Sequence, residues 1–400
     1  MRKYNIVILS IVAIFCFLAT ACQQKTDNYY VSQAIKLADS QIAHNPELWQ
    51  SDFTVKPKWD YTQGLIAEAM LQTYSVSKDT AYLNYVKHYA DYFILPDGQI
   101  RTYKLSQYNI DRVMGGYFLF DLYKLYPKDE YLAAIELLRE QILSQPRTSE
   151  GGFWHKYIYP HQMWLDGLYM GEVFYARYAI EKDEIGLFDD IANQFLTIQK
   201  HTYDSVTGLN YHGWDEAKEQ IWANPETGCS PNFWSRSIGW YMMAMVDVLE
   251  MMPKHHPDYN EIKNTFSALS ASLIKYQDTD TKMWWQVTNR QGDEGNYIES
   301  TASAMFCYSM AKGARIGLID KSYRQIAKDI FSGIEINMIQ SNDDGTISLN
   351  NCCAVAGLGG KNNRNGSYQY YCGALDYNGS STLSMHNYKQ YQHMGRSNSS

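Results

Sequence analysis

The 400-residue sequence is short of positive charge, of cysteine and of linker-like stretches, and each shortage argues against a class of protein. Its formal net charge is −8, and it contains no basic run. Because a nucleic-acid-binding surface needs clustered positive charge, the sequence predicts no nucleic-acid partner. No Pro-, Gly- or Ser-rich stretch divides the chain, which favours one domain over residues 29–400.

Cysteine is sparse beyond residue 22, where only Cys229, Cys307, Cys352, Cys353 and Cys372 occur. An odd number implies no complete disulfide framework, although one pair is compatible with an oxidising compartment. The adjacent Cys352 and Cys353 have no His or Cys partners at metal spacing. We therefore interpret them as buried small residues and predict no metal site.

The N-terminus has the order of a secretory signal. Met1-Arg2-Lys3 precedes an apolar run over residues 6–20, which is short for a permanent membrane span. The ending Ala19-Thr20-Ala21-Cys22 resembles a bacterial lipobox, in which Cys22 would carry a lipid. We expect a lipoprotein signal peptide at 1–21, a polar tether at 22–28 and anchoring on the periplasmic or cell-surface side of a bacterial membrane. An ordinary cleaved signal with a bystander Cys22 is the alternative.

Two kinds of helical stretch alternate along the rest of the chain. Amphipathic stretches are predicted at 29–44, 79–93, 129–143, 184–200, 257–276 and 321–338. Stretches that are apolar on nearly every side are predicted at 60–75, 108–126, 161–181, 235–252 and 298–315. A helix without a polar face must be covered all round. The alternation predicts an all-α fold, an (α/α)6 toroid with outer and inner helices and short loop strands.

Each inner stretch begins with polar and aromatic residues, as in Trp59-Asp60-Tyr61 and Tyr108-Asn109-Ile110-Asp111. Parallel inner helices would gather these ends at one mouth. Helix N-termini favour anions, and Tyr and Trp suit sugar stacking. Although caps alone explain the polar residues, they do not require the aromatics. The pattern predicts a mouth that suits an acidic sugar.

Four blocks carry a family resemblance: residues 152–156 (GFWHK), 162–170 (QMWLDGLYM), 211–215 (YHGWD) and 234–240 (WSRSIGW). In order and spacing they resemble glycoside hydrolase family 105, the unsaturated rhamnogalacturonyl hydrolases, with the family 88 unsaturated glucuronyl hydrolases as relatives. The resemblance spans about Trp59 to Tyr371. It implies an (α/α)6 fold, no metal or other cofactor and a role in the degradation of pectin fragments.

The resemblance also implies an unusual reaction on the 4,5-double bond that polysaccharide lyases leave in a terminal uronic acid. Asp166 matches the proton donor of the family, and Asp111 matches its second active-site carboxylate. Donation requires Asp166 to hold its proton near neutral pH, helped by an apolar surrounding or by the charge of Asp111. An ordinary helix-start carboxylate is the alternative for both.

Further residues match the substrate-binding positions of the family. Arg236 and Lys156 would bind the uronate group, since the guanidinium fork fits a carboxylate. His155 and His212 would bond sugar hydroxyls or the water. The remaining expected lining residues are aromatic: Trp164, Trp234, Trp240 and Tyr61. Core packing is an equally good reading of Trp240.

Three other activities remain open at this point: an unsaturated glucuronyl hydrolase, a polysaccharide lyase on the same fold and a non-catalytic glycan-binding lipoprotein. The sequence predicts a monomer. One region departs from the family pattern, because residues 378–391 are polar and poorly periodic where the family has an apolar last inner helix. Whether the chain after about Asp376 completes the ring is therefore left open.

Overall fold

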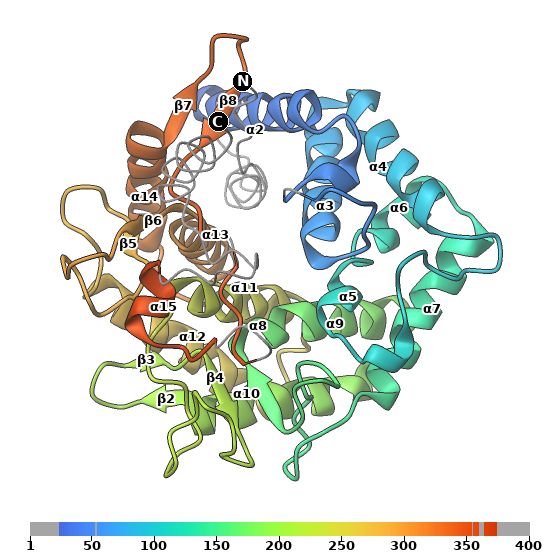
Figure 1. Cartoon of the computed structure of the whole chain (residues 1–400). Coiled ribbons are helices and arrows are strands. Elements are labelled where there is room, and N and C mark those ends of the chain that lie inside the picture. Colours follow the sequence, from blue (N-terminus) through green and yellow to red (C-terminus); the bar gives the residue numbers. More distant parts are fainter. Residues whose placement is uncertain (1–23, 53, 354, 360–363, 374–400) are drawn as a thin grey trace, which may run out of the picture.

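The structure is a computed structural model that describes residues 24–52, 54–353, 355–359 and 364–373. Helices dominate it, and they form a ring of outer and inner segments (Figure 1). The all-α toroid expected from the alternating pattern is confirmed within this range. The expected signal peptide, Cys22 and the chain after residue 373 lie outside the described residues.

The outer segments are amphipathic helices. In chain order they are α2 (Gln24–His44), α4 (Thr80–Phe93), α7 (Asp129–Ser144), α10 (Phe188–Thr202), α12 (Tyr259–Ile274) and α14 (Tyr323–Met338). In α14 the buried residues recur at helical spacing, as Ala327, Ile330, Phe331 and Ile334 illustrate, while the other face is open. α2 begins at Gln24, so residues 24–28 of the expected polar tether are helical.

The inner segments are α3 (Tyr61–Ser77), α5 (Asp111–Met114) with α6 (Leu119–Leu125), α8 (Leu165–Gly167) with η3 (Leu168–Glu172) and α9 (Val173–Glu181), α11 (Ser235–Met251), and α13 (Ser300–Ile316). In α11 every residue from Ser235 to Leu249 is buried, as expected for a helix covered on all sides. The inner helices also pack on one another: α11 lies against α13 on one side and against α8, η3 and α9 on the other (Figure 1).

Two inner segments are interrupted where the sequence predicted continuous helices. Between α5 and α6, Trp59 Nε1 donates to Arg112 O at 3.0 Å and so takes the carbonyl that would continue the helix. The flanking Gly115 and Gly116 have low helix propensity and fit closely under the indole. The third inner segment starts as strand β1 (Gln162–Trp164) and then widens into the π-helical turn η3. Such wide turns often lie at functional sites.

Short antiparallel two-stranded sheets connect the helices. The pairs are β1 with β4 (Gly213–Asp215), β2 (Tyr203–Asp204) with β3 (Leu209–Asn210), β5 (Trp284–Trp285) with β6 (Ile298–Glu299), and β7 (Ile339–Ser341) with β8 (Ile347–Leu349). The expected short loop strands are thus present. β1, β4 and β6 precede or flank the starts of inner helices. These strands therefore fix the positions of the residues at the mouth of the ring.

The remaining elements are short turns of helix: η1 (Leu48–Gln50), η2 (Leu105–Gln107), η4 (Ile185–Leu187) and α15 (Tyr368–Cys372). α15 comes from the end of the described chain and packs by Tyr370 and Tyr371 against Trp234, at the start of α11. No helix within the described ranges is long and apolar enough to cross a membrane.

Candidate active site

Asp166 and His212 form one half of the site. Asp166 lies in the first turn of α8, and Leu165 N donates to His212 O at 2.9 Å, which fixes the two segments side by side. His212 Nε2 lies 3.1 Å from Asp166 Oδ2. The distance suits a hydrogen bond but the atoms are not aligned for one, and neither has another partner among the described residues. Both atoms can therefore bond a substrate hydroxyl or a water molecule.

His212 is held from its other side. Its side chain is fully buried, and its Nδ1 lies 2.7 Å from the hydroxyl oxygen of Tyr371 in α15. Trp234 packs against the imidazole ring at a centroid distance of 4.7 Å and stacks on Tyr371 at 5.7 Å. Aromatic packing and one hydrogen bond thus fix the orientation of His212, so that Nε2 points towards Asp166.

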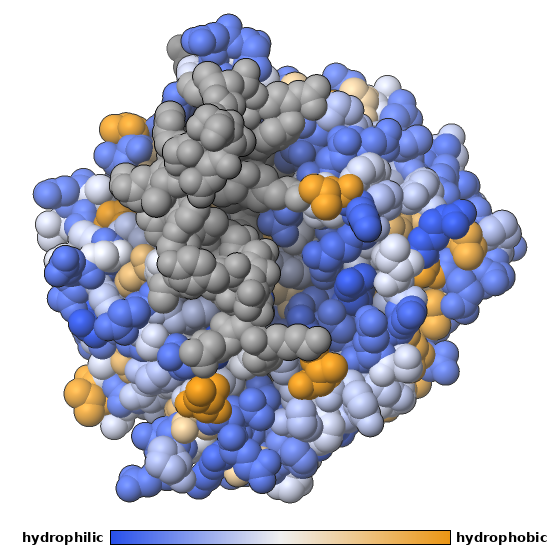
Figure 2. All heavy atoms as spheres, in the orientation of Figure 1, coloured by the Kyte–Doolittle hydropathy of each residue, from blue (hydrophilic) through white to orange (hydrophobic). Residues whose placement is uncertain are grey.

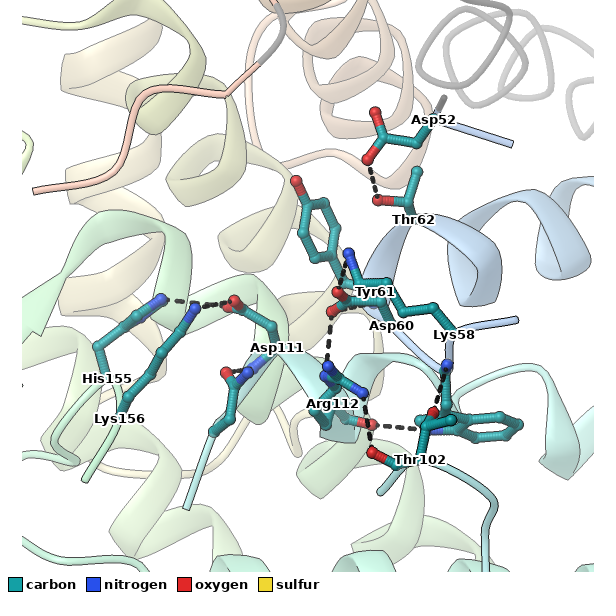
Figure 3. Close-up of polar contacts among 12 residues, drawn as sticks. Asp52, Lys58, Asp60, Tyr61, Thr62, Thr102, Asp111, Arg112, His155 and Lys156 are labelled. Carbon is teal, nitrogen blue, oxygen red and sulfur yellow. Dashed lines mark hydrogen bonds and ion pairs between the residues drawn. The ribbon is translucent and has the colours of Figure 1, made fainter. Parts of the chain in front are cut away.

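Asp111, His155 and Lys156 form the other half of the site (Figure 3). Lys156 Nζ lies 2.6 Å from Asp111 Oδ2, and His155 Nε2 lies 3.1 Å from Asp111 Oδ1. Burial would raise the pKa of Asp111, but Lys156 and His155 outweigh it and hold the pKa well below its ordinary value. Asp111 is therefore an anion at neutral pH. Lys156, which we expected at the uronate, is paired with Asp111 in the absence of substrate.

Trp164 packs between the two halves. Its ring stacks on His155 at a centroid distance of 4.2 Å and meets His212 edge-on at 5.7 Å. Tyr159 stacks against it at 4.9 Å, and only 4% of Trp164 is exposed. The indole therefore spaces the two histidines and keeps bulk water from the region between them. The rings of His155 and Tyr159 already stack on the indole.

Arg236 supplies a buried positive charge beside Asp166. It lies in the first turn of α11, is 4% exposed, and donates from Nη1 to the carbonyl oxygen of Cys353. Burial would lower the pKa of Arg236, but Cys353 and acidic neighbours that include Asp166 outweigh it and raise the pKa above its ordinary value. The guanidinium also lies over the Trp234 ring at 4.9 Å. It is thus charged and fixed, as a carboxylate-binding group must be.

Tyr61 connects the arginine with the Asp111 half of the site. Burial raises the pKa of Tyr61 well above its ordinary value, with the charges of Asp52 and Asp111 adding to the effect and Arg236 opposing it. The phenol therefore stays neutral and can donate a hydrogen bond. Trp240, by contrast, packs edge-on against Tyr61 and lies 5.0 Å from the Tyr169 ring, in the core. It supports Tyr61 from below the mouth.

Two further acidic residues, Asp60 and Asp52, lie near the start of α3 (Figure 3). Asp60 caps α3 through Tyr61 N and pairs with Lys58 at 2.5 Å and with Arg112 at 3.6 Å. Asp52 lies nearby and contacts Thr62 at 3.4 Å. On the face seen in Figure 2, hydrophilic residues gather over α3 and α5 around a hollow.

The sequence did not predict the roles of two residues at the site, Tyr371 and Glu299. Tyr371 reaches His212 from 159 positions away, so no local pattern could have revealed its role. Glu299, at the start of α13, accepts hydrogen bonds from Thr301 N, Ala302 N and Cys353 N, and so holds the chain after β8 beside Arg236. The described residues contain no group of three or more His, Cys, Asp or Glu side chains that could hold a metal ion.

A ring of paired helices with buried carboxylates, histidines, an arginine and aromatic rings at one mouth defines a carbohydrate-active enzyme of the six-hairpin class. The model of Glycosyl Hydrolase Family 88 matches residues 33–380. A family 105 glycoside hydrolase of C. acetobutylicum is 44% identical over 84% of this chain and 92% of its own, with a TM-score of 0.81. The chain therefore belongs to the group of glycoside hydrolases formed by families 88 and 105, and it is a glycosidase.

Two relatives of known sequence are also similar to this chain. A protein of Agrobacterium fabrum is 35% identical over 208 residues, which are 50% of this chain and 88% of that protein. YesR of Bacillus subtilis, named an unsaturated rhamnogalacturonyl hydrolase, is 26% identical over 67% of this chain and 73% of its own length. The family resemblance found in the four sequence blocks is thus confirmed, whereas the roles of individual residues remain predictions.

Proposed function

We propose that the protein releases a terminal 4,5-unsaturated uronic acid from an oligosaccharide. The observation that carries the proposal is the division between the two carboxylates. Asp111 is held as an anion by Lys156 and His155, whereas Asp166 has an unpaired oxygen 3.1 Å from an equally unpaired His212 Nε2. A site with one carboxylate paired to a lysine and a histidine, and a second carboxyl group with an oxygen open to the substrate, suits general acid catalysis.

The reaction follows from the chemistry of the enol ether. Asp166 gives its proton to C4, and the positive charge that develops at C5 is shared with the ring oxygen. Water then adds to C5 and loses a proton, which His212 Nε2 is placed to receive and return to Asp166. The resulting hemiketal opens to a 5-keto sugar, and the bond from C1 to the leaving sugar breaks with it. This course differs from the usual attack at C1 by a pair of carboxyl groups.

The fixed charges around the pair have separate tasks. Arg236 binds the uronate carboxylate, since its charge is buried and its fork fits two oxygens. The anion of Asp111 stabilises the positive charge that develops at C5. Tyr61, between the two, donates to a sugar hydroxyl. The apolar surface of Trp164 limits competing water.

The leaving sugar is proposed by analogy with YesR, which is named for unsaturated rhamnogalacturonyl substrates. We propose an unsaturated galacturonyl group linked to rhamnose, as found in fragments of pectic rhamnogalacturonan. The same carboxylate-binding residues would also accept a glucuronyl end, so the aglycone sugar decides between the substrates.

The experiment follows the ultraviolet absorbance of the conjugated double bond in lyase-treated rhamnogalacturonan, homogalacturonan and glucuronyl fragments. The wild-type protein removes the absorbance of the rhamnogalacturonan fragments, and Asp166→Asn slows this by about 10²–10⁴-fold, the usual contribution of a general acid. Asp247→Asn is the matched control, because Asp247 is a buried carboxylate in α11 that pairs with Lys312 at 2.8 Å, far along the helix from Arg236.

Three other results would contradict the proposal. Absorbance that appears from intact polymer indicates a lyase. Binding of fragments that is equal in wild type and Asp166→Asn, without any turnover, indicates a glycan-binding protein. Removal of absorbance that Asp166→Asn leaves unchanged assigns the acid to another residue.

We also propose that the mature protein is exported and anchored through a lipid on Cys22. The support is the order of charged, apolar and small residues before Cys22. Cells fed with labelled palmitate should yield a labelled membrane-bound protein, and Cys22→Ser should abolish the label. An unlabelled protein in the soluble fraction would favour the ordinary cleaved signal.

A further inference from the structure

A small cavity lies behind His155, on the side away from Asp111. It has a volume of about 10 Å³, which is close to the least that holds one water molecule, and its lining includes Ile110, Met163, Trp164, Glu172 and Gln194. His155 is 3% exposed and Glu172 is 1% exposed, so bulk water reaches neither side chain.

Two polar atoms beside this cavity are unsatisfied. His155 Nδ1 and Glu172 Oε2 are buried, and neither has a hydrogen-bond partner among the described residues. A buried polar atom without a partner costs about 1–3 kcal/mol. A water molecule that bonds both atoms removes this cost at two places.

The surrounding chain leaves this space open to the two side chains. A Cβ atom at Gly167 would lie 3.2 Å from His155 Nδ1, so the glycine clears the approach to that nitrogen. Glu172 is the last residue of η3, the π-helical turn that follows Asp166. Gln194, also at the cavity, donates to Gly151 O and Asp190 Oδ1, so its amide hydrogens are already used.

We propose that Glu172 is a positioning residue: its carboxyl group donates a hydrogen bond to one water molecule in this cavity, and that water donates a hydrogen bond to His155 Nδ1. The acceptor role of Nδ1 places the imidazole hydrogen on Nε2, which faces Asp111 at 3.1 Å. Glu172 and the anion of Asp111 thus act together to keep the hydrogen of His155 on Nε2. The inference rests on the proposed function for the importance of His155, but the arrangement itself is independent of turnover.

The hydrogen bond from Glu172 to the water requires an uncharged carboxyl group. Burial raises the pKa of the Glu172 carboxyl well above its ordinary value of 4.5, and the charge of Asp190 adds to this effect. Arg147 opposes it, but Arg147 forms a two-point pair with Asp190 at 2.6 and 2.8 Å. A neutral carboxyl group donates its hydrogen to the water, and the water is then oriented to donate to Nδ1.

The first test uses the wild-type protein alone. In protein labelled with ¹⁵N-histidine, the two ring-nitrogen shifts of His155 should show a hydrogen on Nε2 and a hydrogen-bond acceptor at Nδ1. The signal is assigned by its loss in His155→Gln. A hydrogen on Nδ1, or on both nitrogens, overturns the proposal. Because no substrate is present, this result does not depend on whether the proposed reaction is correct.

Two variants then separate the donor from the space it fills. Glu172→Gln keeps a donor of the same size and should retain the tautomer, with kcat/KM within about threefold of wild type, less than a single hydrogen bond is worth. Glu172→Met removes the donor and should change the ¹⁵N shifts and lower kcat/KM by about 10–100-fold, as loss of an orienting partner does. Asp247→Asn controls for the loss of a buried carboxylate elsewhere and should leave the His155 shifts unchanged.

Two outcomes with the variants would overturn the proposal. One is a Glu172→Met protein with wild-type shifts and rate. The other is a Glu172→Gln protein that is as impaired as Glu172→Met, because the hydrogen-bond donor would then not be the property that matters. If Glu172→Met does not fold, the wild-type shifts and Glu172→Gln still decide.

Discussion

Replacement of Lys156 by Met tests the electrostatic design of the Asp111 half. Lys156 Nζ lies 2.6 Å from Asp111 Oδ2, and the two side chains are 21% and 12% exposed. Removal of one partner of a fully buried ion pair costs about 3–5 kcal/mol. Since Lys156 is partly exposed and His155 still contacts the carboxylate, we expect Lys156→Met to lower the free energy of unfolding by about 2–3 kcal/mol near pH 7.

The pH dependence of this loss gives a sharper result. The pKa of Asp111 is lower in the folded protein than in the unfolded chain, so its ionisation stabilises the fold above the unfolded pKa of about 3.9. That contribution is lost as the pH falls through the folded value. Lys156→Met raises the folded pKa, and the uptake of a proton then relieves the unpaired charge. The deficit should therefore be largest near pH 7 and shrink towards about pH 4.

Urea unfolding of four proteins measures the pair directly: wild type, Lys156→Met, Asp111→Asn and the double variant. In the Asp111→Asn background, Lys156→Met should cost at least about 1.5 kcal/mol less than in the wild type, because the charge it would expose is gone. Equal costs in both backgrounds would refute the reasoning. So would a deficit of the same size at low and neutral pH.

Two further predictions concern Asp52 and Tyr371. Burial raises the pKa of Asp52 from 3.8 to about 6, so the protonated form stabilises the fold below the unfolded pKa and this contribution is lost as the pH rises through about 6. Asp52→Asn should therefore raise the free energy of unfolding by at most about 3 kcal/mol near pH 7 and not below about pH 4, in thermal melts; a variant equally stable at both would contradict this. Tyr371→Phe removes the 2.7 Å contact with His212 Nδ1 and should lower kcat/KM by about tenfold. Tyr370→Phe, which loses a 2.7 Å bond to Gly357 O, is its control, and equal effects of the two would argue against the role of Tyr371.

The helices were predictable where the pattern of apolar and polar residues shows which faces are buried. α11 has no polar face, and α14 has one, so the inner and outer assignments follow from composition and period alone. The break between α5 and α6 did not follow, because its cause is the Trp59 indole, 53 positions from Arg112. A local pattern contains no information about such a partner.

The site shows the same limit. The four sequence blocks supplied Asp166, His155 and His212, and the start of the second inner stretch supplied Asp111. The structure brings these residues together as two carboxylate–histidine pairs. The partner of Lys156 was not predictable, since the sequence offers a carboxylate of the protein and one of the substrate as equal candidates. Glu172 also gave no signal: on an apolar helix it reads as an isolated polar residue, and only the cavity next to His155 suggests a reason for it.

The bond between Tyr371 and His212 also has a consequence for how the chain acquires activity during folding. Helices that follow one another in sequence, such as α3 and α4, contact each other and can form early. The bond between Tyr371 and His212 instead closes a loop of 159 positions. α15 docks on the start of α11 only when α15 and α11 have both formed. Catalytic competence should then lag behind the recovery of helical signal in a refolding experiment. Turnover therefore reports the docking of α15, and a chain in which α15 has not docked would be helical and compact but catalytically inactive.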